Sequence, residues 1–123
     1  STRPRCNLVK DDLVYAGHML DIARSAVNKI TRRSRADFDG DDNLRLALAH
    51  LVQTIGEAAR HVSAEFQARN PAISWSKIVG MRHRVVHDYM HVDYDIVWDV
   101  VTHELPPLIG LLSRIVPENE SGT

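Results

Sequence analysis

The chain has a single cysteine, Cys6, and no long apolar run. One cysteine permits no disulfide within the chain and no zinc site built from cysteines, which suits a reducing compartment. No apolar run approaches the ~18 residues of a membrane span. The first residues, from Ser1 to Arg5, carry no apolar signal core. We therefore expect a cytoplasmic chain with no membrane partner.

The chain also has little net charge, with a formal value of -1 and a pI near 6.6. It therefore has no global attraction for nucleic acid, and any such site must be a local basic patch. Its 123 residues, 44% hydrophobic and 25% charged, are typical of one globular domain. We expect a single domain over residues 1–123, with a core from 10–116 and loose termini at 1–9 and 117–123.

Apolar residues recur at helical spacing along the first half of the chain. One helix is expected from Asp11 to about Arg33, capped by Asp11 or Asp12, and a loop at residues 37–42 follows it. A second helix is expected from about Asp42 to Arg69, ended by Asn70-Pro71. The first apolar stripe consists of Leu13, Ala16, Leu20, Ala23, Val27 and Ile30, and the second of Leu44, Leu48, Leu51, Ile55, Ala58 and Val62.

The second half of the chain continues the helical pattern. Ser74 is placed to cap a helix from Trp75 to about Val86 or beyond, and Asp93 to cap a fourth helix that Pro106-Pro107 kinks or restarts. No alternating strand pattern exceeds a few residues. The sequence predicts an all-α fold, an antiparallel bundle of four to five helices, with Trp75 and Trp98 as core anchors.

Residues 82–89 combine side chains that can bind phosphate, transfer a proton and supply a hydroxyl. Arg82 offers a planar fork of donors for phosphate, His87 can move a proton near neutral pH, and Tyr89 supplies a hydroxyl. With a 2′-hydroxyl as nucleophile, Arg82 and His87 could cleave RNA without a metal. The alternative is a solvated basic face on which His87 bonds to backbone.

The geometry of this segment on a helix is awkward. Arg82 and His87 are five residues apart, about 140° around a continuous helix, so they do not share one face. Either the helix ends or distorts here, or a second copy of the chain completes the site.

A rival interpretation of the same segment is a metal site. His83, His87 and His91 are four apart and could supply imidazoles to zinc or nickel. Three ligands on one straight helix would span about 12 Å, too far for one ion. A histidine pair with Asp88, or with a ligand from a partner chain, remains open.

Gly56 and Glu57 form a second unusual stretch. A glycine inside a strong helix costs about 1 kcal/mol relative to alanine, and close approach of another helix would explain it. Glu57 either points into the bundle and holds Arg82 or His87, or is solvated.

Five stretches carry a resemblance to a known family. They are Ile55-Gly56-Glu57-Ala58, Ile73-Ser74-Trp75, Gly80-Met81-Arg82, Val86-His87-Asp88-Tyr89 and Ile96-Val97-Trp98. In order and spacing, from about Leu13 to Leu112, the chain resembles the HepT-like branch of the HEPN superfamily.

The resemblance implies a helical bundle that pairs into a symmetric homodimer and acts as the toxin of a type II/VII-like toxin–antitoxin system. It implies a metal-independent endoribonuclease, without cofactor, that cleaves messenger or transfer RNA. Its partner would be an MNT-type nucleotidyltransferase antitoxin (MntA-like), which silences the toxin by binding or by AMPylation. By the same resemblance Arg82 and His87 are catalytic, Tyr89 is the AMP acceptor, and Glu57 is a supporting polar group.

One position departs from the family pattern. His83 stands where a neutral polar residue such as asparagine is frequent, so it could add a second proton carrier or change the substrate preference. Two other functions stay open at this point: a non-catalytic helical dimer that binds a nucleotidyltransferase partner or nucleotide, and a metal-dependent enzyme.

Overall fold

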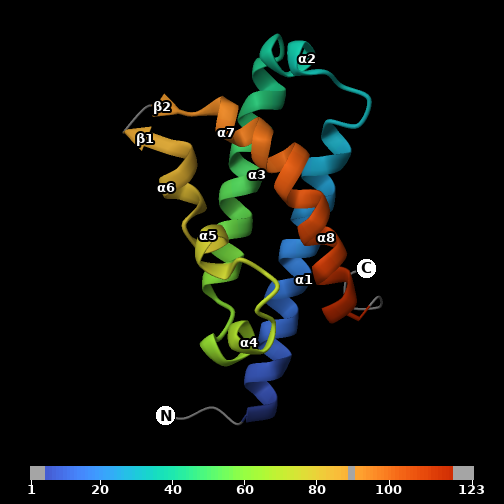
Figure 1. The fold of residues 1–123 in the computed structure, drawn as a ribbon, viewed down its shortest axis with the longest axis vertical. Helices are drawn as coiled ribbons and strands as arrows, with labels where there is room; N and C mark the ends of the chain where they lie inside the picture. The colour runs from blue at the N-terminus through green and yellow to red at the C-terminus, as the bar shows by residue number, and fades with distance from the viewer. Residues whose placement is uncertain (1–4, 89–90, 118–123) are drawn as a thin grey trace.

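Two long helices and one bent helical run pack side by side as the body of the molecule (Figure 1). The computed structural model describes residues 5–88 and 91–117, with side chains from residue 11 onward. The all-α fold class is confirmed, with one small hairpin as its exception. The elements are α1 (Arg5–Lys29), α2 (Arg35–Asp39), α3 (Asp42–Arg60), α4 (Ala64–Arg69), α5 (Trp75–Val79), α6 (Met81–Val85), β1 (Val86–Asp88), β2 (His91–Val92), α7 (Tyr94–Asp99), the π-helix η1 (Val100–Glu104) and α8 (Leu105–Ile115).

The core lies between α1, α3 and the α7–η1–α8 run. The stripe expected on the second helix is confirmed, since each of its members except the half-buried Leu51 is buried. Trp75 is also buried, and its indole N–H donates to the carbonyl of Asn70 at 3.0 Å. Trp98 packs against the ring of Phe38, with 5.0 Å between ring centroids. Both tryptophans therefore serve the core, as expected.

The predicted cap of the first helix is wrong. α1 begins at Arg5, so Asp11 and Asp12 lie inside it, and residues 5–9 of the expected loose terminus are helical. Asp12 is buried and accepts hydrogen bonds from the backbone N–H of Ser63 at 2.8 Å and from its hydroxyl at 2.7 Å. A buried carboxylate needs such donors. Asp12 thus ties α1 to the chain that follows α3.

The predicted second helix is broken. α3 ends at Arg60, and α4 starts only after Ser63, whose hydroxyl accepts from the N–H of Phe66 at 3.1 Å. A capping serine competes with helix continuation because its side chain satisfies the donors of a new first turn. The expected loop at 37–42 likewise begins inside α2, which Ser34 and Asp37 start with a reciprocal capping box.

The predicted third helix is divided in two, and it ends close to the predicted Val86 without extending beyond it. α5 and α6 meet at Gly80, and α6 stops at Val85. The chain then forms an antiparallel hairpin in which Val86 pairs with Val92 and Asp88 with His91. Strands of three and two residues are too short for an alternating pattern to announce them. Ser74 occupies the N-cap position, but its side chain makes no capping hydrogen bond.

The predicted fourth helix is confirmed in its start and its irregularity. Asp93 caps α7 by accepting from the N–H of Ile96 at 3.1 Å. η1 then interrupts the run just before Pro106 and Pro107, which lack the N–H donors of a regular turn. Among the described residues, no helix is both long and apolar enough to cross a membrane. Residues 118–123 of the expected loose tail lie outside the described residues, and the domain limits stay a prediction.

Candidate active site

Gly56 brings α5 and α6 against α3. A Cβ at this position would lie 2.7 Å from the carbonyl oxygen of Ile78 and 3.1 Å from the Cβ of Met81. Only glycine accommodates a backbone carbonyl that close. The predicted close helix approach is confirmed, and it fixes the distance between the core and the segment that carries Arg82.

α6 is a short helix with one buried face. Met81 and Val85 are buried, while Arg82 and His83 are exposed. Arg82 and Arg84 are two residues apart, about 200° around the helix, so they leave it on opposite flanks of the buried face. The guanidinium of Arg82 makes no hydrogen bond or ion pair with any other residue that the structure describes.

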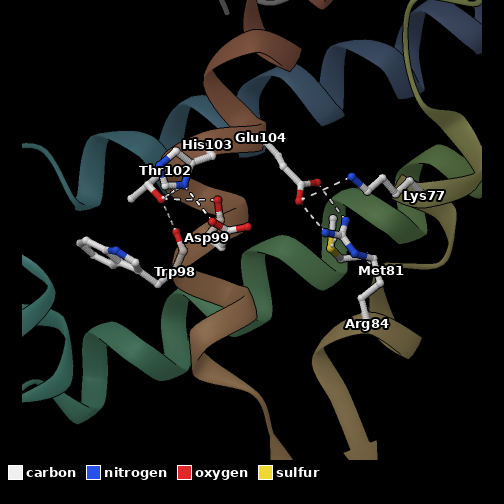
Figure 2. A network of polar contacts seen from close by, with 8 residues as sticks. All are labelled: Lys77, Met81, Arg84, Trp98, Asp99, Thr102, His103 and Glu104. Atoms are coloured by element: carbon white, nitrogen blue, oxygen red, sulfur yellow. Dashed lines mark hydrogen bonds and ion pairs between the residues drawn. The ribbon is translucent and has the colours of Figure 1, made fainter.

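Arg84 is occupied by a carboxylate of η1. Its two terminal nitrogens donate to the two oxygens of Glu104 at 2.9 and 2.5 Å, and Lys77 lies 3.9 Å from the same carboxylate (Figure 2). The hydrogen bond to Arg84 is the main reason that the pKa of Glu104 is lowered, and Glu104 in turn raises the pKa of Arg84. Both side chains are largely shielded from solvent. This pair joins α6 to the bent run and neutralises one of the two arginines of the motif.

His87 lies outside α6, on strand β1 of the hairpin. Because α6 ends at Val85, the awkward helical geometry between Arg82 and His87 does not arise. The Nε2 atom of His87 lies 2.8 Å from Oδ2 of Asp93, and 58% of the His87 side chain is exposed. The hydrogen bond with His87 is the first reason that the pKa of Asp93 is lowered. The histidine is therefore held at one nitrogen and open to solvent elsewhere.

Glu57, the predicted supporting residue, contacts neither Arg82 nor His87 in the part of the chain that the structure describes. Glu57 is exposed and lies 3.5 Å from Arg60, on a groove shared with Tyr15 and His18 of α1. The solvated alternative for Glu57 is thus the one observed in the single chain. Tyr89, the proposed AMP acceptor, lies outside the described residues.

The histidines of the metal interpretation are distributed over three elements. His83 belongs to α6, His87 to β1 and His91 to β2, where Nδ1 of His91 lies 3.0 Å from a carboxylate oxygen of Asp88. Among the side chains that the structure describes, no three of histidine, cysteine or the acidic residues converge as a set of metal ligands. Chemically, the exposed guanidinium of Arg82 can bind phosphate and the exposed imidazole of His87 can transfer a proton.

Asp93 is the site residue that sequence reasoning placed only as a helix cap. The cap was visible because aspartate precedes an apolar helical run. The contact of Asp93 with His87 depends on the hairpin, which returns the chain to the end of α6. There the N–H of Asp93 donates to the carbonyl of Val85 at 2.7 Å. Five intervening residues separate His87 from Asp93, and no helical spacing relates them.

Comparison with known protein families gives a match over most of the chain. The sequence matches the family described as "Ribonuclease HepT-like" over residues 19–115. No solved structure matches the chain.

Three relatives are named as ribonucleases. "Putative RNase TTE0752" of Caldanaerobacter subterraneus is 31% identical over 106 residues, covering 86% of this chain and 95% of that protein. "Putative RNase MJ1380" of Methanocaldococcus jannaschii is 29% identical over 73% of this chain and 85% of its own length. "Probable ribonuclease HepT" of Thermococcus cleftensis is 29% identical over 64% of this chain and 72% of its own length. The chain belongs to the HepT-like family of the HEPN superfamily.

Proposed function

We propose that this chain is an endoribonuclease toxin that cleaves RNA without a metal ion, with Arg82 and His87 as its catalytic residues. One observation carries the proposal: Arg82 on α6 and His87 just after the end of α6 both have exposed side chains. Arg84, which would otherwise compete for phosphate, is already paired with Glu104. Membership of the HepT-like family and the names of the relatives support the same reaction class.

The reaction is a transesterification in which the phosphoryl group passes from the 5′-oxygen to the neighbouring 2′-oxygen. His87 takes the proton of the 2′-hydroxyl while its oxygen attacks phosphorus, and the leaving 5′-oxygen takes a proton from imidazolium. The guanidinium of Arg82 binds the phosphate and stabilises the charge of the pentacoordinate phosphorus. The products are a 2′,3′-cyclic phosphate and a 5′-hydroxyl. His83, exposed beside Arg82, is a candidate second proton carrier.

The central test is cleavage of total RNA in EDTA by the wild type and by His87→Ala. Cleavage by the wild type only is the expected result. His103→Ala is the matched control, since His103 is also exposed and also paired with an aspartate, Asp99, at 2.9 Å. Equal cleavage by wild type and His87→Ala, or none by either, contradicts the assignment. Stoichiometric zinc in the purified protein with activity lost in EDTA would favour a metal enzyme instead.

A homodimer is the second part of the proposal. Two copies of the motif across a two-fold axis would double the local positive charge, which a near-neutral chain otherwise lacks. Mixing Arg82→Ala with His87→Ala and allowing subunits to exchange tests whether the copies share a site. If Arg82 of one protomer serves His87 of the other, about a quarter of wild-type activity returns, because half of the dimers are mixed and each has one intact site. No recovery would place both residues of a site in one protomer.

Control by an antitoxin is the third part. The proposed partner is an MNT-type nucleotidyltransferase that binds this chain and transfers AMP to Tyr89. AMP there would add bulk and negative charge two residues from His87, and would repel RNA phosphate as phosphorylation does. Intact mass measured with and without the partner should show increments of AMP, and none in Tyr89→Phe. Co-purification with the partner and no RNA cleavage by the free chain would favour the non-catalytic binding module.

A further inference from the structure

Asp93 is fixed in place by three hydrogen bonds that leave it little freedom. Its N–H donates to Val85 at 2.7 Å, its Oδ1 accepts from Ile96 at 3.1 Å, and its Oδ2 meets His87 at 2.8 Å. The side chain is 28% exposed, half the exposure of His87. One carboxylate therefore joins the hairpin, the start of α7 and the imidazole ring.

The charge of Asp93 determines which nitrogen of His87 carries the proton. The pKa of Asp93 is lowered by the hydrogen bond with His87 and by that with Ile96, so the group is a carboxylate near neutral pH. A carboxylate only accepts hydrogen bonds. The proton between the two groups must then sit on Nε2 of His87, which leaves the lone pair of the neutral ring on Nδ1; among the described residues, none bonds to Nδ1.

Two other histidine–aspartate pairs in the described chain differ from this one. His91–Asp88 and His103–Asp99 join residues three and four apart, at 3.0 and 2.9 Å. In each of them the aspartate is mostly exposed, at 68% and 61%. The His87–Asp93 pair instead joins two elements, and its aspartate is anchored at a helix start. Its geometry is that of a base and the group that orients it.

We infer that Asp93 is the positioning residue of His87, holding the ring as its Nε2–H tautomer so that Nδ1 is the atom that accepts the 2′-hydroxyl proton. This inference rests on the proposed ribonuclease function. The 2′-hydroxyl proton passes to Nδ1, the O2′–P bond forms, the P–O5′ bond breaks, and the 5′-oxygen takes its proton from a His87 imidazolium. Asp93 keeps its charge throughout and stabilises the imidazolium without taking a proton.

Asp93→Asn is the decisive variant because it changes the hold on His87 and preserves the cap. Asparagine caps helices as well as aspartate, so its oxygen can still accept from Ile96. Its amide N–H₂ then faces Nε2 and donates to it, which forces the proton onto Nδ1. The geometry survives with the wrong tautomer, a change that costs about 10²–10⁴-fold in rate where a histidine is the base.

The experiment combines two readouts on the full chain. Nitrogen-15 spectra of histidine-labelled protein report which nitrogen of His87 is protonated, with His87→Ala to assign the signal. RNA cleavage in EDTA reports the rate. We expect Nε2–H in the wild type, Nδ1–H in Asp93→Asn, a rate loss of about a hundredfold or more, and an unchanged circular dichroism spectrum. Asp99→Asn, the matched control on the His103 pair, should leave the His87 signal and the cleavage rate unchanged.

The outcomes separate this inference from the proposed function. Nδ1–H in the wild type, an unchanged tautomer in Asp93→Asn, or equal cleavage by Asp93→Asn and wild type would each overturn the role of Asp93. If the wild type cleaves no RNA, the proposed function fails, while the spectra still decide whether Asp93 sets the tautomer of His87.

Discussion

The Arg84–Glu104 pair and the His87–Asp93 pair lie three residues apart along the motif but differ in what they leave available. Arg84 and Glu104 satisfy each other through two hydrogen bonds and are mostly shielded from solvent. His87 meets Asp93 through one ring nitrogen and remains 58% exposed. The first pair closes a contact between α6 and η1. The second pair holds His87 at one ring nitrogen and leaves more than half of its side chain exposed, as the proposed catalytic role requires.

The largest expected effect separates the two arginines of α6. Arg82→Ala should lower the RNA cleavage rate about 10²–10³-fold, because a donor to the developing charge is lost. Its stability should change by less than ~0.5 kcal/mol, since Arg82 is exposed and unpaired among the described residues. Arg84→Ala should do the reverse: its stability should fall, and its cleavage rate should stay within tenfold of the wild-type rate. Steady-state cleavage and urea unfolding measure both. The same profile in the two variants would remove the distinction drawn between the arginines.

The next effect concerns the packing that places the motif. Gly56→Ala should lower the free energy of unfolding by about 1–3 kcal/mol, because the new Cβ meets the backbone carbonyl of Ile78. Gly110→Ala on α8 is the control, since nothing lies within 4 Å of its Cβ position. There the better helix propensity of alanine should raise stability by up to ~1 kcal/mol. Stabilisation in both variants would mean that α5 and α6 do not depend on Gly56.

A smaller effect is expected at the Arg84–Glu104 pair. Glu104→Gln keeps the shape of the side chain and removes its charge, so the unfolding free energy should fall by about 1–2 kcal/mol. Cleavage should stay close to that of the wild type, because the Glu104 carboxylate pairs with Arg84 and Lys77, neither of which is a proposed catalytic residue. Thermal unfolding and the cleavage assay give the two values. A loss of activity without a loss of stability would move Glu104 into the site.

The smallest effect is a dependence of stability on acid pH. The pKa values of Glu104 and Asp93 are lowered in the folded chain, by Arg84 and by His87 respectively. A lowered folded pKa gives stability above the unfolded value, and this stability is lost as pH falls through the folded value. The melting temperature should therefore decline as pH drops below about 4.5, and less steeply in Glu104→Gln. An equal dependence of melting temperature on pH in the two proteins would show that the Arg84–Glu104 pair is not ionic.

Much of the fold follows from local sequence signals. The stripe on α3 and the cap at Asp93 are visible in the sequence because periodicity and capping depend on neighbours within four residues. The close approach at Gly56 is visible because a glycine inside a strong helix calls for a packing reason. The capping of α4 by Ser63 was equally local, but the helical pattern of Val62 and Phe66 runs across the break and concealed it.

The parts that escape the sequence depend on contacts between distant residues. The sequence offers Asp11 or Asp12 as a helix cap, and only the fold shows Asp12 buried against Ser63, 51 residues away. The exposure of Glu57 depends on how α3 is turned within the bundle. The partnership of His87 with Asp93 needs a hairpin whose strands are shorter than any period can reveal. The motif residues themselves were accessible from sequence, whereas the group that orients His87 was not.

The proposed reaction is RNA cleavage by Arg82 and His87 with the 2′-hydroxyl as nucleophile, and the chemical ends of the products are its most direct test. A defined RNA incubated with the purified chain in EDTA should yield 2′,3′-cyclic phosphate and 5′-hydroxyl ends, and His87→Ala should yield neither. Products with 3′-hydroxyl and 5′-phosphate ends would show that water attacked phosphorus. That result, or the same ends from His87→Ala, would contradict the central claim.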